Sequence, residues 1–222
     1  MRRDPAKTIG WLALTGSRTP ARRVSRVAGG TPDRDVLYHY EVAFGSVVQY
    51  GLMLGLVLWI GKGLPKRELL ALRRPRTGFW ATTGLVALTL GVIIAVSALL
   101  EQVANAGEEQ GLTPDRWDPS RAGAYAASFV AVAVVAPIVE ELTYRGEGFT
   151  LLSAYGRWVA ILGTGLAFAL GHGLLVGLPV LLVFGLGLAW LRDRTDSVYP
   201  GIVLHSIFNG AALIAAVTIG TS

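Results

Sequence analysis

The sequence predicts an all-α fold, a polytopic integral membrane bundle of about six transmembrane helices. Of its 222 residues, 52% are hydrophobic and only 16% are charged, whereas a soluble domain carries about 25% charged residues. Apolar runs recur along the chain, and they are long enough to cross a bilayer, which takes about 20 residues. The 28 glycines fit the same class, because small residues let membrane helices approach closely. We therefore expect a multi-pass protein of the plasma (cell) membrane, in contact with membrane lipids.

The composition also excludes several kinds of chemistry. The chain has no cysteine, which rules out disulfides, thiolate catalysis and cysteine-rich zinc sites. A net charge of +5 could indicate nucleic acid, but most of the basic residues flank apolar spans. There they anchor a protein at the membrane surface and set its topology. We therefore predict no nucleic-acid partner.

The chain divides into three predicted regions. Residues 1–35 are expected to form a flexible basic tail, because their one apolar run is too short for the core of a signal peptide. Residues 36–121 hold two transmembrane helices and an acidic loop, and residues 122–222 hold the remaining helices. The six predicted spans are residues 37–60, 78–100, 122–153, 158–172, 174–191 and 199–219.

Prolines and charges shape these spans and their connections. Pro137 is expected to kink the third span, and Pro200 suits the first turn of the sixth. The loop 61–77 is basic, whereas the connection 101–121 is acidic. The positive-inside rule therefore places the loop 61–77 in the cytoplasm. With six spans the basic tail would lie on the opposite side, which conflicts with the same rule.

Three pairs of side chains interrupt the apolar spans. Each ionised group at the centre of a membrane helix costs about 2.5–3.5 kcal/mol, so a cluster of them calls for a functional reason. Residues four apart share one helix face. The pairs are Glu141 with Arg145, Phe168 with His172 and His205 with Asn209, and Glu140 precedes the first pair. We predict that the third, fourth and sixth spans enclose a polar pocket, with Phe168 in its wall.

The residues of this pocket suit hydrolysis by a water molecule that a glutamate activates. The spacing of Glu141 and Arg145 predicts an ion pair, which leaves Glu140 to face the pocket. A partly desolvated carboxylate accepts a proton from water more readily, because desolvation raises its basicity. His205 and Asn209 can donate hydrogen bonds to a developing oxyanion.

The chain resembles the CAAX-protease and bacteriocin-processing family of intramembrane endopeptidases in three ordered motifs. These motifs are Glu140-Glu141-x-x-x-Arg145, Phe168-x-x-x-His172 and His205-x-x-x-Asn209, on successive membrane helices. The resemblance marks residues 122–222 as a CAAX-protease-like catalytic core. It implies hydrolysis of a peptide bond inside the bilayer, in a lipidated or membrane-bound peptide or protein. It also implies that Glu140 activates water with the help of His172, while His205 and Asn209 stabilise the oxyanion.

Three alternatives remain open at this stage. In a zinc-dependent version of the same protease, the metal ligands would be Glu140, Glu141, His172 and His205. We favour a protease without a cofactor, because Arg145 would compete for Glu141 and repel a cation. A non-catalytic immunity or scaffold protein would use the polar cluster only for helix packing. A transporter or proton relay would use intramembrane Glu and His side chains, but the sequence shows no inverted repeat.

Overall fold

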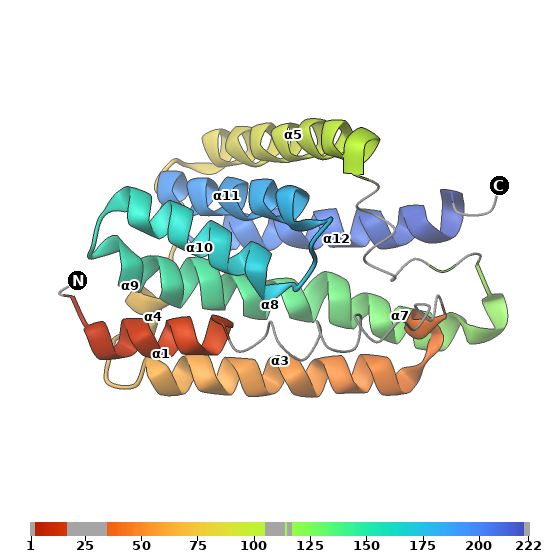
Figure 1. The fold of residues 1–222 in the computed structure, drawn as a ribbon, viewed down its shortest axis with the longest axis horizontal. Helices are drawn as coiled ribbons and strands as arrows, with labels where there is room; N and C mark the ends of the chain where they lie inside the picture. Colours follow the sequence, from red (N-terminus) through yellow and green to blue (C-terminus); the bar gives the residue numbers. More distant parts are fainter. Residues whose placement is uncertain (1–2, 17–34, 105–113, 115–116, 220–222) are drawn as a thin grey trace.

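The computed structural model describes residues 3–16, 35–104, 114 and 117–219, and the long helices run along one common axis (Figure 1). The described residues contain helices and no strand, which confirms the predicted all-α membrane bundle. In chain order the elements are α1 (Pro5–Gly16), η1 (Val36–Tyr38), α3 (Tyr40–Ile60), α4 (Lys66–Leu69), α5 (Phe79–Ala104), η2 (Pro119–Arg121), α7 (Ala122–Val130), η3 (Ala131–Val135), α8 (Ala136–Glu141), η4 (Leu142–Gly148), α9 (Phe149–Ser153), α10 (Arg157–Gly171), α11 (Leu178–Thr195) and α12 (Tyr199–Ile219).

A continuous helical stretch over Pro119–Ser153 forms the centre of the bundle. Two segments of it, η3 and η4, are π-helical, so their backbone hydrogen bonds skip one residue more than in an α-helix. The first lies directly before Pro137, where the sequence predicts a kink and where proline removes a backbone donor. The second follows Glu141 at once. Such segments are frequent at functional sites.

The other helices surround this central stretch. The helix α3 packs on one side of it and α12 on the other, while α10 and α11 form a hairpin that contacts η4 (Figure 1). The helix α5 packs against α11 and α12. The outer faces expose large hydrophobic side chains such as Trp59, Phe79 and Trp80. Lipid, not water, is the natural surrounding for such a surface, and the chain is an integral membrane protein.

Within the part of the chain that the structure describes, four helices are long and apolar enough to cross a membrane. These are Tyr40–Ile60, Phe79–Leu100, Pro119–Ser153 and Tyr199–Thr218, and they coincide with four of the six predicted spans. The other two predicted spans correspond to α10 and α11. Their connection lies near the middle of the long axis, so this hairpin enters the bundle and returns to the same end (Figure 1). The number of six spans therefore stays a prediction.

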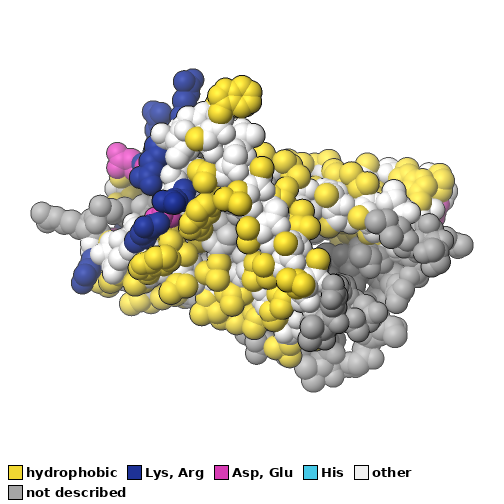
Figure 2. Space-filling model, turned by 90° about the horizontal axis from the view of Figure 1, so that it is seen from above, with side chains coloured by type: hydrophobic (Ala, Val, Ile, Leu, Met, Phe, Trp, Pro, Cys, Tyr) yellow, Lys and Arg dark blue, Asp and Glu magenta, His cyan; other side chains and the backbone are white. Residues whose placement is uncertain are grey.

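Positively charged side chains gather at one end of the bundle, which we call the basic end (Figure 2). The loop 61–77 meets the α11–α12 connection there, because Arg73 donates to the backbone oxygen and the carboxylate of Asp196 at 2.8 and 2.6 Å. Burial raises the pKa of Asp196, but hydrogen bonds from Arg73 and Arg192 outweigh it and lower the pKa overall. The last turn of α11 carries Arg192 and Arg194, so two basic segments of the chain lie at this end.

The opposite end of the bundle carries the described part of the acidic connection. Arg121 binds the carboxylates of Asp118 and Asp35 at 2.6 and 2.9 Å. Hydrogen bonds from Ser120 and Arg121 lower the pKa of Asp118 to about 2. Most of the acidic residues between 101 and 121 lie outside the described side chains.

The prediction of a flexible tail is wrong for Pro5–Gly16, which form α1. This helix packs against α3, α9, α10 and η4, and its Trp11 is fully buried. It begins at the basic end, where Lys7 Nζ donates to the backbone oxygens of Ile60 and Lys62. The apolar run of this segment is too short for the core of a signal peptide, yet it suffices to pack on other helices. The rest of the predicted tail, 17–34, lies outside the described residues.

Candidate active site

Glu141 and Arg145 form an ion pair inside the bundle. Arg145 Nη1 donates to Glu141 Oε1 at 2.9 Å, and neither side chain is exposed. The same oxygen lies 3.1 Å from Nδ1 of His205, which is also buried. The ion pair predicted from the spacing is confirmed, and it extends from the central helix to α12.

Neighbouring helices complete the surroundings of this pair. Arg145 Nη2 donates to the carbonyl of Gly185 on α11 at 2.8 Å, and the guanidinium lies 4.5 Å from the centre of the Phe168 ring. The attraction between a cation and an aromatic face is strongest where water is excluded. Gly201 of α12 leaves room for Glu141, since a Cβ at that position would lie 2.7 Å from Oε2. The pair is thus fixed from α10, α11 and α12.

Glu140 has different partners from those of Glu141. Its side chain is buried, and its Oε1 accepts a hydrogen bond from the Tyr50 hydroxyl of α3 at 2.9 Å. Its Oε2 lies 3.9 Å from Nε2 of His205. Successive residues of an α-helix point about 100° apart. Because of that rotation, one carboxylate meets Arg145 and the other faces α3 and His205.

His172 lies at the C-terminal end of α10 and is half-buried. Its Nδ1 is 2.8 Å from the carbonyl oxygen of Phe168. A carbonyl only accepts, so Nδ1 carries the proton and Nε2 of the neutral ring is an acceptor. The Phe168 ring contacts the rings of both His172 and His205, with centroids 4.5 and 5.7 Å apart. Phe168 therefore lies between the two histidines.

Asn209 joins α12 to the central helix. Its Nδ2 donates to the backbone carbonyl of Val132, within η3, at 3.0 Å. Polar side chains commonly link membrane helices in this way. The amide group carries a second N–H, which is the donor that a role in oxyanion stabilisation would need.

Two polar residues near this site were not singled out from the sequence. Tyr50 is one of three tyrosines in the predicted span 37–60, and only the packing of α3 against α8 brings it to Glu140. Glu147, in η4, is fully buried, and neither of its carboxylate oxygens has a hydrogen-bond partner among the described residues. Its position inside the third predicted span could have drawn attention to it, because placing an ionised side chain within a membrane helix costs free energy.

The zinc alternative needs at least three ligands around one point. Across the described residues, no group of three or more His, Cys, Asp and Glu side chains has that arrangement. Glu141 Oε1 already binds Arg145 and His205. Both His172 and His205 direct Nδ1 at an oxygen, as metal-binding imidazoles do. As arranged, however, the described side chains do not fit a zinc ion.

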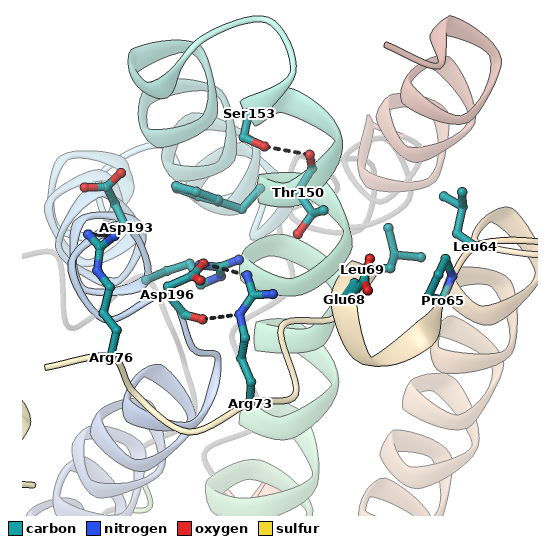
Figure 3. A pocket seen from close by; sticks show the side chains of 12 residues that line it. Leu64, Pro65, Glu68, Leu69, Arg73, Arg76, Thr150, Ser153, Asp193 and Asp196 are labelled. Atoms are coloured by element: carbon teal, nitrogen blue, oxygen red, sulfur yellow. Dashed lines mark hydrogen bonds and ion pairs between the residues drawn. The ribbon is translucent and has the colours of Figure 1, made fainter. Parts of the chain in front are cut away.

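Two cavities lie away from Glu140. One of about 520 Å³ is at the basic end, between the loop 61–77, α9 and the end of α11, with Arg73 and Asp196 joined in its wall (Figure 3). The other, of about 470 Å³, lies between α1 and residues 152–159. Glu140, His172 and His205 line neither cavity. The Glu140 side chain is only 5% exposed.

Comparison with known proteins agrees with the motifs. Residues 122–211, less than half of the chain, match the family described as type II CAAX prenyl endopeptidase Rce1-like. The predicted resemblance is confirmed, and the match supports a membrane protease of the CAAX type that acts on peptide substrates. The matched region contains α7 to α11 and the first part of α12, with all three motifs. Neither the curated proteins nor the solved structures gave a match.

Proposed function

We propose that this chain, with its Rce1-like region at residues 122–211, is an intramembrane endopeptidase in which Glu140 activates water. One observation carries the proposal. A carboxylate buried within the bundle lies 3.9 Å from a histidine Nε2, while a second carboxylate beside it is neutralised by Arg145. A desolvated carboxylate next to a histidine is a suitable general base.

In the first proposed step, a water molecule bound between Glu140 and His205 attacks the peptide carbonyl. Glu140 takes one proton of the water, and the water oxygen bonds to the carbonyl carbon. The carbonyl π bond opens to place a negative charge on its oxygen. His205 Nδ1 lies against Glu141, so Nε2 of the neutral ring accepts a hydrogen bond from the water and orients it.

In the second proposed step, the tetrahedral intermediate collapses. The C–N bond breaks, and Glu140 returns its proton to the leaving nitrogen, which gives an amine and a carboxylic acid. The second N–H of Asn209 is the proposed donor to the oxyanion. His205 can add a donor from Nε2 only in its doubly protonated form. His172 presents the Nε2 acceptor from α10 and assists in holding the water.

Glu141 and Arg145 have a supporting role in this proposal. A buried carboxylate without a counter-charge strongly destabilises a folded protein, and the guanidinium of Arg145 offsets this for Glu141. The pair also fixes His205, because Glu141 Oε1 contacts both Arg145 and the imidazole. Arg145 therefore holds the histidine in one orientation through the carboxylate.

We further propose that the substrate is a membrane-bound peptide, with a prenylated C-terminal CAAX sequence as the first candidate. This rests on the match to the type II CAAX prenyl endopeptidase Rce1-like family and on the burial of Glu140 within the bundle. The proposed location is the plasma membrane. No metal is required in this mechanism, so a chelator should leave cleavage unchanged. Loss of cleavage with a chelator, restored by zinc, would replace this mechanism by the zinc-dependent one.

The test is a Glu140→Gln variant in liposomes, assayed with an internally quenched peptide that ends in a farnesylated CAAX sequence. Glutamine keeps the shape and hydrogen bonding but cannot take a proton. We expect cleavage to fall by about 100-fold or more. The matched control is Glu147→Gln, which alters a second buried carboxylate of the same helix and should keep its activity.

A search that does not presuppose the substrate complements this assay. Termini of membrane proteins are compared between cells with wild-type protein and cells with Glu140→Gln. New termini that depend on Glu140 would identify the substrate. A scaffold protein would show equal termini and keep its phenotype in the variant, and that result would reject the peptidase.

A further inference from the structure

Tyr50 of α3 contacts the carboxylate on which the proposed function depends. Its hydroxyl donates to Glu140 Oε1 at 2.9 Å, although the two residues are 90 positions apart. Hydrogen bonds from a neutral hydroxyl to a carboxylate are roughly twice as strong as those between neutral groups. Tyr50 lies outside the matched region 122–211, so the site extends beyond the family core.

The packing of α3 explains why Tyr50 points inward. Met53 and Val57, three and seven positions further along, are the buried residues of the same helix face. Phe44, Leu52 and Trp59 on the remaining faces are exposed. The inward face contacts α8, which carries Glu140. The direction of the tyrosine is therefore set by the burial of this helix face against the bundle.

The hydrogen bond fixes a side chain that is otherwise adaptable. The terminal torsion of glutamate is broad and nearly two-fold, so its two oxygens can exchange places. With Oε1 bound to Tyr50, Oε2 is the oxygen that lies toward His205 Nε2, at 3.9 Å. A catalytic group displaced by about 1 Å can cost about 100-fold in rate.

We propose that Tyr50 is a positioning residue for Glu140, which holds Oε1 so that Oε2 faces His205 and the water. This inference rests on the proposed function, since it assigns the base to Glu140. Tyr50 acts through the carboxylate and does not contact the peptide. The helix α3 then belongs to the active site, and the 122–211 region alone lacks one of its contacts.

The kinetic test compares Tyr50→Phe with Tyr125→Phe, using the farnesylated peptide in liposomes. Both variants lose one hydroxyl that bridges two helices, because the Tyr125 hydroxyl donates to the carbonyl of Leu213 at 2.7 Å. We expect kcat to fall by about 10- to 100-fold in Tyr50→Phe, with KM changed less than about twofold. Tyr125→Phe should keep kcat. Equal kcat values in the two variants would overturn the proposal.

A second pair of variants, built on Glu140→Asp, distinguishes a positioning role of Tyr50 from a general effect on stability. In Glu140→Asp the carboxylate is one methylene shorter, so the Tyr50 hydroxyl no longer supports it in the same position. Adding Tyr50→Phe there should change kcat by less than about twofold, because residues that act as a unit are non-additive. A full 10- to 100-fold further loss would show that Tyr50 acts independently of Glu140.

The third measurement needs no substrate. Dicyclohexylcarbodiimide adds to a protonated carboxyl group to form an O-acylisourea, and mass spectrometry locates the product. Tyr50→Phe removes a hydrogen bond that holds Glu140 Oε1, so labelling of Glu140 should become several-fold faster, while labelling of Glu147 in the same sample stays constant. An unchanged Glu140 rate would refute the positioning role. Full activity of Glu140→Gln would instead refute the proposed function, whatever the labelling shows.

Discussion

The indole Nε1 of Trp11 donates a hydrogen bond to the backbone carbonyl of Thr143 at 2.8 Å, across 132 positions of sequence. Thr143 lies in η4, between Glu141 and Arg145. The Trp11 ring also packs edge-on against Tyr144, with centroids 6.2 Å apart. The N-terminal helix therefore supports the segment that carries the buried ion pair.

Gly148 makes this contact possible, and Gly148→Ala should disrupt it. A Cβ at Gly148 would overlap ring carbons of Trp11, so α1 would have to move. We expect a loss of about 1–3 kcal/mol of stability, as for other overpacked sites. Thermal unfolding in detergent, followed by near-ultraviolet circular dichroism, measures it.

Gly45→Ala is the control for that variant, because nothing lies within 4 Å of its added Cβ. It should be neutral or slightly stabilising, since alanine favours the helix over glycine. If Gly148→Ala were as stable as Gly45→Ala, α1 would not be held by Trp11 in the way described.

The elements and contacts that the sequence predicts correctly have local signals. Long apolar runs predicted the positions of α3, α5, the central helix and α12, because crossing lipid requires an uninterrupted helix. The Glu141–Arg145 pair also followed from local spacing, because residues four apart on a helix meet without any help from the rest of the fold.

The contacts between distant segments could not be predicted in this way. Tyr50 and Trp11 reach the central helix only through the packing of α3 and α1, and neither has a spacing signal. The partner of Asn209, a carbonyl in η3, depends on a π-helical segment that one sequence does not reveal. Tertiary packing, not local propensity, decides these positions.

Gly201→Ala should impair the ion-pair cluster directly. Its Cβ would lie 2.7 Å from Glu141 Oε2, an oxygen that is buried and has no partner among the described residues. The carboxylate must shift, and it takes His205 with it, so we expect a loss of about tenfold or more in kcat. Peptide cleavage in liposomes measures it.

Gly210→Ala, on the same helix, is the matched control for Gly201→Ala. Its added Cβ would meet Phe129 at 3.4 Å, an ordinary contact, so cleavage should stay at the wild-type rate. Equal loss in both variants would mean that any added methyl group on α12 is harmful, and the Glu141 argument would fail.

Glu147→Met should stabilise the protein. The glutamate is fully buried and its two oxygens lack hydrogen-bond partners among the described residues. The nearby Lys7 and Lys66 donate to the backbone carbonyls of Leu58, Ile60 and Lys62, not to this carboxylate. Methionine keeps the unbranched length and removes the polar atoms, so we expect a gain of about 1–3 kcal/mol.

Thermal unfolding compares Glu147→Met with Glu41→Met, which removes an exposed carboxylate of α3. The exposed variant should stay within about 0.5 kcal/mol of wild type. A destabilised Glu147→Met would indicate instead that the buried carboxylate has a required partner.

The Asp196 contact should make stability depend on pH in a defined direction. Burial raises the pKa of Asp196, yet the hydrogen bonds from Arg73 and Arg192 lower it overall. The pKa of Asp196 in the folded protein lies below its unfolded value of about 3.9. The stabilisation that the ionised carboxylate gives to the folded protein is therefore complete above about pH 3.9, and it is lost as the pH falls through the folded pKa. It amounts to at most about 1 kcal/mol, since the side chain is 42% exposed and solvent screens it.

Asp196→Asn removes only the ionised carboxylate, because asparagine also tolerates the left-handed backbone at this position, where φ is 54°. The variant therefore measures the stabilisation that the carboxylate gives. Wild type should be more stable than the variant by a constant amount from pH 7 to about pH 5. The difference should then shrink as the pH falls below about 4. Unfolding temperatures in detergent across this range measure it. A difference that grows on acidification would have the opposite sign and would contradict the assignment of Arg73 and Arg192 as the partners of an ionised Asp196.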